Sequence, residues 1–481
     1  MTREALAIAV IAVPAAASVL LAVIPRGVVT RVALAWALPS GGLALALAAR
    51  ALTDPSHPFA SKWIAVDAAG GLIVGVTGIV GLTSVLFSPA YLKTVHHEHR
   101  ERHYFSVLYA FWAVVLAVPL VGNLGGAWLL IEATTAASAL LVGFSGRPRA
   151  LEAGWKYLIL TSVGLGVALL GIVLLAAGIP GGGLGALTWH ALGTYGAGRH
   201  TAIVAYLLLL AGLAAKIGWA PVHNWLPDAH SEAPAPVSAL LSAALLPAVL
   251  LVAWRCEHSL APVVGIHTAQ GVLIAFGLAS LAVAVPFLWR PLAWKRLLAY
   301  SSLEHMGVIA IGIGFGTPLA LAGVAVHVVG HAIAKALGFY AATPLLRHEP
   351  RAAGHAVTGI SHTRPELGAT LGISLGFLAG LPPSPLFLSE LLIVAGGFQS
   401  GRPWAAGAST LLLALGFLGL MHALLETTVG KARRRDAGSV PGLRSLSALT
   451  TVSTVLLLVL TGIGIWLPSS DLVKALVTGI S

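Results

Sequence analysis

Three protonatable side chains, His327, His331 and Lys335, recur four positions apart in the apolar stretch HVVGHAIAKALGF. In an α-helix each such step turns the side chain by about 400°, so the three lie on one flank over about 12 Å of rise. A neutral imidazole accepts a proton on one nitrogen and donates one from the other, so the spacing favours a proton relay. A zinc site is the alternative, because histidines four positions apart can share a metal. Lys335 is a poor third ligand, however, and the local sequence offers no close carboxylate.

Other ionisable residues also interrupt apolar stretches. They are Glu132 in LLIEATT, Lys216 in AAKIGWAP, Glu304 and His305 in SSLEHMGVIAIG, and Glu390 in FLSELLI. A charged side chain at the centre of a bilayer costs at least about 2.5–3.5 kcal/mol, and such residues typically mark ion pathways. Glu132 could instead be a protonated packing residue, and Lys216 could extend its ammonium to the membrane surface. We favour a proton-carrying role for both.

Two of the apolar stretches are broken by proline. Prolines 221 and 227 interrupt KIGWAPVHNWLPDAHSEAPAP, and prolines 382, 383 and 385 interrupt LAGLPPSPLFLSE. The first break also carries Asp228, His230 and Glu232, which serve either as a proton entry group or as stabilisers of a re-entrant loop. Paired interrupted helices in corresponding halves of a chain indicate an inverted repeat with its site at the membrane midplane.

Composition places the whole chain in the membrane. Hydrophobic residues make up 57% of the 481 residues and charged residues only 9%, which excludes a long soluble domain. The net charge of +11 comes from basic residues in short loops, which fits membrane orientation better than nucleic-acid binding. The single Cys256 excludes a thiolate-ligated iron–sulfur cluster or a cysteine-rich zinc site. The histidine-rich stretch TVHHEHRERHY, residues 94–104, predicts a solvated loop rather than a metal site.

Hydrophobic runs of about 20 residues predict an all-α integral membrane protein with about fourteen transmembrane helices. We expect two inverted five-helix repeats, helices four to eight and nine to thirteen, with helices seven and twelve broken by proline. The expected units are an N-terminal three-helix segment (1–104), the first repeat (105–254), the second repeat (268–427) and a C-terminal helix (428–481). Most Lys and Arg residues fall in loops after odd-numbered helices, which predicts both termini on the non-cytoplasmic side.

Taken in order, several motifs resemble the antiporter-like, proton-conducting membrane subunits of respiratory complex I, membrane-bound hydrogenases and multisubunit cation/proton antiporters. They are the helix-five Glu132, AKIGWAPVHNWLPDAHSEAPAPVSALL with Lys216, KRLLAYSS with Lys295, HVVGHAIAKAL with Lys335, and GLPPSPLFLSELL with Glu390. Within this family, ALEAGWKYLILTSVG and LLAYSSLEHMGVIAIGIG are most similar to component F of hydrogenase-4 and formate hydrogenlyase type complexes. The resemblance covers helices four to thirteen.

The resemblance implies a subunit that moves protons along a row of intramembrane charges, driven by redox chemistry in other subunits. Glu132 and Lys216 would form a coupled pair in the first half, His327, His331 and Lys335 a central relay, and Glu390 the terminal site. No cofactor is expected on this chain; iron–sulfur clusters, NiFe or flavin would belong to partner subunits. Many complex I relatives carry a histidine in helix eight where this chain has Ser242, so water would have to complete the path there.

The expected setting is the cytoplasmic (inner) membrane, beside the other membrane subunits of a hydrogenase-like or NADH-quinone oxidoreductase-like complex, with protons as the transported species. The alternative is a subunit of a multisubunit cation/proton antiporter or an inorganic-carbon uptake system without redox partners. A structural spacer that has lost transport fits poorly with so many intramembrane charges.

Overall fold

The structure is a computed structural model that describes residues 2–97, 100–179, 186–196, 198–348, 358–431 and 443–478. Its regular structure in these ranges is helical apart from one short antiparallel hairpin, in which β1 (Phe59–Ala60) pairs with β2 (Ala65–Val66). A helix satisfies its own backbone hydrogen bonds, which hydrocarbon cannot do. The predicted all-α membrane fold is therefore confirmed. Glu98 and His99 of the histidine-rich stretch lie outside the described residues.

Thirteen helical segments in the described ranges are long and apolar enough to cross a membrane. They are α1 (Arg3–Val23), α2 (Val29–Thr53), α3 (Ala68–Thr94), α4 (Glu101–Ala117), α5 (Leu124–Val142), α6 (Pro148–Ala177), α8 (Arg199–Ile217), α10 with α11 (Ala235–Leu240, Leu246–Val264), α12 (Ile266–Leu288), α13 (Trp294–Phe315), α14 (Pro318–His348), α18 (Pro403–Val429) and α19 (Leu443–Trp466). A further crossing is divided between α16 (Pro365–Leu378) and α17 (Pro385–Gln399). Together they match the predicted number of about fourteen. The short helices are α7 (Trp189–Leu192), α9 (Trp225–Glu232), α15 (Ile360–Thr363) and α20 (Asp471–Thr478).

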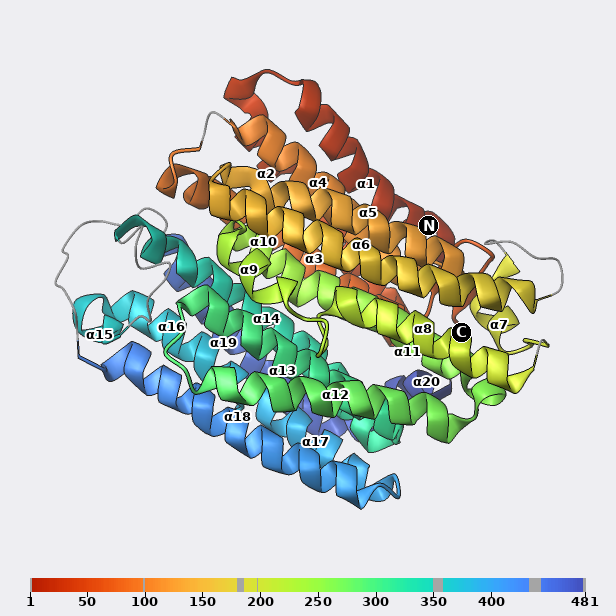
Figure 1. Ribbon diagram of the computed structural model, residues 1–481. Helices are drawn as coiled ribbons and strands as arrows, with labels where there is room; N and C mark the ends of the chain where they lie inside the picture. Colours follow the sequence, from red (N-terminus) through yellow and green to blue (C-terminus); the bar gives the residue numbers. More distant parts are fainter. Residues whose placement is uncertain are drawn as a thin grey trace.

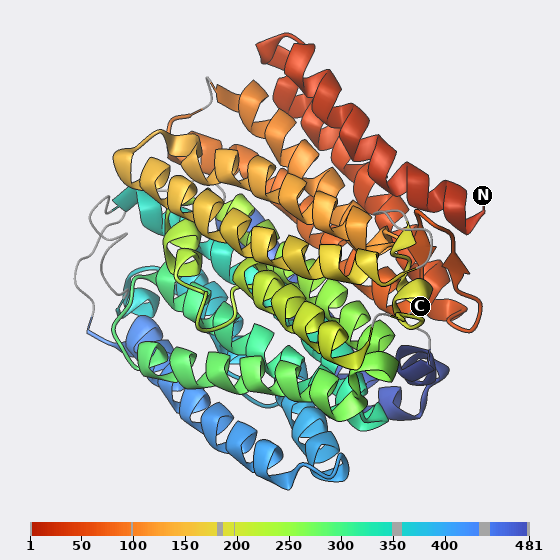
Figure 2. The ribbon, with the colours of Figure 1, turned by 45° about the vertical axis from the view of Figure 1, so that its right-hand side comes forward.

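The helices that carry Glu304, His305 and the file of His327, His331 and Lys335 lie at the centre of the bundle. The most apolar 18-residue stretches of α10–α11 and of α13 are wholly buried, whereas most residues in the corresponding stretches of α18 and α19 are not. Figure 2 shows α1 and α2 at one edge of the molecule and α18 at the opposite edge. The central helices are therefore shielded by apolar ones, as intramembrane ionisable residues require.

Small residues let α6 and α8 pack closely side by side (Figure 1). Gly164 on α6 and Gly212 on α8 face each other, and a Cβ on either glycine would overlap the other helix. Close backbone approach through small residues is a common way for membrane helices to associate. Here it brings the side of α6 that carries Tyr157 against the end of α8 that carries Lys216.

Both proline-rich breaks are present. The first separates α8 from α9 and the second separates α16 from α17. Gly218 in the first and Gly380 in the second have φ of 82° and 76°, a left-handed conformation that glycine adopts without a Cβ penalty. The Ala220–Pro221 and Pro382–Pro383 peptide bonds are cis. A third irregularity follows α10, where Leu241–Leu245 forms a π-helical turn that includes Ser242.

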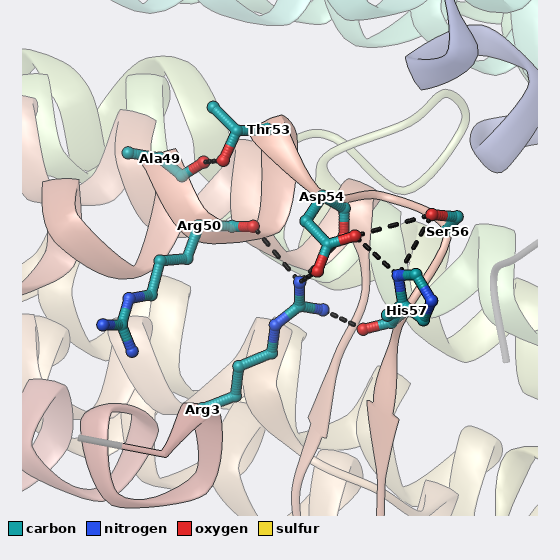
Figure 3. A network of polar contacts seen from close by, with 7 residues as sticks. All are labelled: Arg3, Ala49, Arg50, Thr53, Asp54, Ser56 and His57. Carbon is teal, nitrogen blue, oxygen red and sulfur yellow. Dashed lines mark hydrogen bonds and ion pairs between the residues drawn. The ribbon is translucent and has the colours of Figure 1, made fainter.

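The N-terminal end of α1 is tied to the C-terminal end of α2 (Figure 3). The Arg3 guanidinium donates 2.8 Å bonds to the Asp54 carboxylate and carbonyl, and a further bond to the His57 carbonyl. The His57 ring lies 2.7 Å from the same carboxylate. This hydrogen bond, and to a smaller extent the Arg3 charge, lowers the pKa of Asp54. The contacts join the start of α1 to the end of α2.

Figure 1 places the N-terminus and α20 at one end of the bundle and α15 at the other. An even number of crossings leaves both chain ends on the same side. Which compartment that side faces stays a prediction. The inverted relation of helices four to eight and nine to thirteen, and the four units with boundaries at 104, 254, 268 and 427, also stay predictions.

Candidate functional site

Lys216 lies one residue before the end of α8, and its ammonium is buried among hydroxyls. Nζ donates to Thr135 Oγ1 on α5 at 2.7 Å and to Tyr157 OH on α6 at 2.5 Å. The Tyr157 hydroxyl also bonds to Ser138 at 2.7 Å. A buried charge is tolerated only when hydrogen-bonded, and these hydroxyls supply that bonding.

Glu132 lies one helical turn before Thr135 and is half-buried. Ser162 on α6 donates to its Oε1 at 2.6 Å, while Oε2 has no hydrogen-bond partner among the described residues. Lys216 and Glu132 do not form a direct ion pair; the Thr135 hydroxyl takes the lysine's bond instead. The first half therefore offers one cation in fixed bonds and one carboxylate oxygen that can accept a proton.

Asp228 and Glu232 lie at the partly exposed mouth of the first break. Asp228 is 3.2 Å from Arg296 and 3.9 Å from Lys156, and Glu232 is 3.4 Å from Arg147. All of these side chains are partly exposed, so solvent screens the pairs. These contacts hold α9 in place, and both carboxylates can be reached by water at the mouth.

Lys295 and His230 lie deeper behind that mouth. The Lys295 ammonium donates to the carbonyls of Ser231 at 3.0 Å and Ala233 at 2.5 Å, where the chain turns from α9 into α10. His230 is fully buried with its ring stacked on Phe339 at 5.2 Å, and neither ring nitrogen has a hydrogen-bond partner among the described residues. Lys295 thus secures the turn, while His230 is a buried imidazole available to protons.

Lys335 is fully buried on α14 and reaches α13. Its Nζ donates to the Leu298 carbonyl at 3.0 Å and to Ser301 Oγ at 2.9 Å. The same carbonyl accepts from Ser302 at 2.8 Å, and Ser302 lies 2.7 Å from Ser242. Because the single proton of the Ser302 hydroxyl is committed to Leu298, Ser242 is the donor to Ser302. Ser242 therefore connects to Lys335 through one hydroxyl and one carbonyl.

His305 on α13 and His327 on α14 form a hydrogen-bonded imidazole pair, with His305 Nδ1 and His327 Nε2 3.0 Å apart. His327 Nδ1 lies 2.8 Å from Ser389 Oγ on α17, and Ser389 donates its own proton to the Leu386 carbonyl at 2.7 Å. Ser389 must therefore accept from a protonated His327 Nδ1, which leaves the lone pair of His327 on Nε2. In the neutral pair, His305 Nδ1 is then the donor.

Glu390 is half-buried beside Ser389, and one of its carboxylate oxygens joins the imidazole pair in a compact cluster. One ligand-type atom from each of His305, His327 and Glu390 lies within 4.8 Å of the other two. His305 and His327 come from the consecutive helices α13 and α14, whereas Glu390 comes from α17, much further along the chain.

His331 and Glu304 complete the second half. Both are buried, and both His331 ring nitrogens and Glu304 Oε2 have no hydrogen-bond partner among the described residues. The His331 ring centroid lies 4.9 Å from that of His305. The sequence-derived file of His327, His331 and Lys335 is therefore joined by His305 from the neighbouring helix.

Sequence reasoning missed the hydroxyl groups of the site. Thr135, Tyr157, Ser301 and Ser389 each bond to one of the lysines or histidines, yet uncharged hydroxyl groups do not stand out from sequence alone as the intramembrane charges do. Their position gives a weak signal: Thr135 follows Glu132 by one helical turn, and Ser389 directly precedes Glu390. Tyr340 on α14 was also missed; its hydroxyl bonds to Thr83 at 2.8 Å and to Ser84 at 2.9 Å on α3.

Comparisons with known proteins show the family of the chain and its fold. Residues 121–416 match the family described as NADH:quinone oxidoreductase/Mrp antiporter, transmembrane. A hydrogenase-4 component F homolog from Methylacidiphilum infernorum is 32% identical over 394 residues, which is 79% of this chain and 81% of that protein. NADH-quinone oxidoreductase subunit N from Desulforudis audaxviator is 30% identical over 465 residues, 92% of this chain and 89% of that protein.

Among solved structures, a chain of the membrane-bound sulfane sulfur reductase, an archaeal respiratory membrane complex, has a TM-score of 0.86 at 21% identity. The alignment covers 100% of this chain and 98% of that one, so the whole fold is shared. The chain belongs to the NADH:quinone oxidoreductase/Mrp antiporter family of multi-pass membrane proteins.

Proposed function

We propose that this chain is a proton-translocating membrane subunit of an energy-converting oxidoreductase complex, of the hydrogenase-4/formate hydrogenlyase or NADH-quinone oxidoreductase type. The observation that carries the proposal is the His305–His327 pair, buried between the Lys335 region and Glu390 and bonded through a single proton. A proton that arrives at His305 Nε2 releases the one on Nδ1 to His327 Nε2, and the Nδ1 proton of His327 is then free to leave past Ser389 toward Glu390. This sequence returns both rings to neutrality.

The first half sets the charge that drives this transfer. Lys216, with Glu132 one turn from its Thr135 partner, is the switch, and Asp228, His230 and Glu232 are the candidate entry groups. Lys295 supports the entry region through its carbonyl bonds. When Lys216 gains or loses its proton, the electrostatic field at the central relay of His331 and Lys335 changes with it.

The link between the halves passes through Ser242. Its donor bond to Ser302 orients one hydroxyl toward the Lys335 network, and water fills the remaining distance to the Lys216 hydroxyls. Glu304, buried beside this network, is the carboxylate that balances the Lys335 charge. Glu390 is the terminal group of the path.

The subunit works with other membrane subunits, and the redox centres of the complex belong to those partners. We place it in the cytoplasmic membrane with both termini on the non-cytoplasmic side, because most basic loop residues then face the cytoplasm. The paired mouth residues Asp228 and Glu232 consequently open to the cytoplasm.

The test is the Lys216→Ala variant in the assembled complex, reconstituted into sealed vesicles. Redox-driven proton uptake should be lost while the subunit composition and electron transfer with an uncoupler are retained. Tyr206→Phe is a matched control, since its hydroxyl bonds to the Ala269 carbonyl at 2.9 Å on another face of α8. Full proton uptake by Lys216→Ala would overturn the proposal.

A cation/proton antiporter without redox partners is the second candidate, because the matching family includes Mrp antiporter subunits. Copurification separates the two: hydrogenase or quinone-reductase subunits favour the first function, and antiporter subunits alone favour the second. An inorganic-carbon uptake system would be identified in the same way by its partners.

A further inference from the structure

We propose that His305, His327 and Glu390 also form a binding site for a divalent cation of the zinc class, and that the bound cation stops proton transfer. Two imidazole nitrogens and one carboxylate oxygen come within 4.8 Å of one another in the interior of the bundle. Nitrogen ligands with one carboxylate are typical of zinc and related transition metals, whereas sodium, magnesium and calcium prefer sites built from oxygen.

The hydrogen bonds already leave one imidazole nitrogen, Nε2 of His327, unprotonated and able to bind a metal. Ser389 accepts from His327 Nδ1, so the lone pair of His327 is fixed on Nε2, the atom that faces His305 at 3.0 Å. Metal-bound histidines characteristically use their second ring nitrogen as a donor to such a partner, which fixes the ring and its tautomer. Ser389 is itself anchored by its bond to the Leu386 carbonyl.

The second nitrogen needs only a change of tautomer. If the proton of His305 moves from Nδ1 to Nε2, two lone pairs point at each other between α13 and α14. His305 Nε2 has no hydrogen-bond partner among the described residues, so the move breaks no bond there. Tetrahedral zinc with bonds of about 2.0–2.1 Å separates two nitrogens by about 3.3 Å. The two nitrogens, now 3.0 Å apart, therefore have to separate by a few tenths of an ångström, and each ring has to turn so that its lone pair points at the metal rather than at the other ring.

The metal and the transferred proton then compete for the same imidazole lone pairs. A cation held by His305 Nδ1 and His327 Nε2 occupies both atoms between which the proposed proton passes, so transport stops while it is bound. This inhibition rests on the proposed function, but binding does not. The zinc site can therefore be tested without measuring proton movement.

The experiment titrates the purified full chain with Zn²⁺ against a chromophoric chelator. Wild-type chain and the exposed-histidine control His190→Gln should bind one more tight equivalent of zinc than the His305→Gln and His327→Gln variants. Ser389→Ala keeps all three ligands and should weaken that equivalent by about 10–100-fold, the usual effect of removing an outer hydrogen-bond partner. Equal stoichiometry and affinity in the wild type and in the His305→Gln/His327→Gln double variant would overturn the site.

X-ray absorption of the zinc-loaded wild-type chain gives a test that depends on no variant. The expected spectrum has two imidazole nitrogens with oxygen at about 2.0–2.1 Å. A spectrum with sulfur, or with oxygen ligands alone, would contradict the assignment. Zinc binding without loss of proton transport would support the binding site but contradict its inhibitory role. A Lys216→Ala variant that loses proton transport and still binds zinc would show that zinc binding does not depend on transport.

Discussion

The two halves of the bundle hold their buried lysines in similar ways but surround them differently. Lys216 is bonded by the hydroxyls of Thr135 and Tyr157, and Lys335 by a carbonyl and the Ser301 hydroxyl. Around Lys335, however, buried atoms of three residues have no hydrogen-bond partner among the described residues, namely His305, His331 and Glu304. Beside Lys216 one oxygen of Glu132 is in the same position. An unsatisfied buried polar group costs about 1–3 kcal/mol, unless water bridges it.

This difference fits different roles for the two halves in the proposed proton transport. The first half holds the Lys216 ammonium by two hydroxyl bonds, which suits a switch with two states. The second half keeps proton-accepting atoms without fixed partners, which suits a path along which protons move. The comparison predicts that replacing a proton-carrying side chain of the second half interrupts transport, as replacing Lys216 itself does, whereas replacing a hydroxyl that holds Lys216 only slows proton uptake.

The largest effect is expected for His327→Gln. Glutamine keeps a polar group near Ser389 but cannot gain a proton on one side and lose it on the other. Positioned proton-transfer groups contribute about 100-fold or more to rate. Proton uptake by reconstituted vesicles should fall by at least about 100-fold, with His190→Gln unchanged. Retention of more than half the wild-type rate would contradict the assignment of the second half as the proton path, because the imidazole pair would then be structural.

A smaller effect is expected for Tyr157→Phe. The change removes one of the two hydroxyl bonds to the Lys216 ammonium, and a hydrogen bond to a charged group contributes about 1.5–3 kcal/mol. Proton uptake should slow by about 10-fold while the complex still assembles. Tyr206→Phe serves as the matched control on α8. An effect as large as that of His327→Gln would show that the first half carries protons through this hydroxyl rather than setting a charge.

The smallest effect is expected for Ser242→Ala. Its hydroxyl donates only a neutral bond to Ser302, worth about 0.5–1.5 kcal/mol, and water can replace it. Proton uptake should fall by no more than about 10-fold relative to Ser409→Ala, a buried serine on α18 that bonds only within its own helix. Complete loss of uptake would mean that Ser242 passes the proton itself.

The architecture could be predicted from the sequence because its causes are local. Long apolar runs specify the crossings, and the prolines around Pro221 and Pro383 specify the two breaks. The file of His327, His331 and Lys335 could be recognised from spacing alone.

The assembly of the site could not be predicted in the same way. Glu390 reaches the imidazole pair only because α17 packs against α13 and α14, and a single sequence does not record that contact. For the same reason the local sequence around His327 offered no carboxylate for a metal site. Lys216 bonds to the hydroxyls of Thr135 and Tyr157, which the sequence could not assign as its partners, while its coupling with Glu132 stays a prediction.

The central claim is that proton movement depends on the buried charges of the second half while electron transfer in the partner subunits does not. The most direct measurement is the ratio of protons taken up to electrons transferred by Lys335→Met complexes in sealed vesicles. The account predicts a lowered ratio with electron transfer retained when an uncoupler is present. A ratio equal to that of the wild type would contradict it, and the chain would then be a structural spacer.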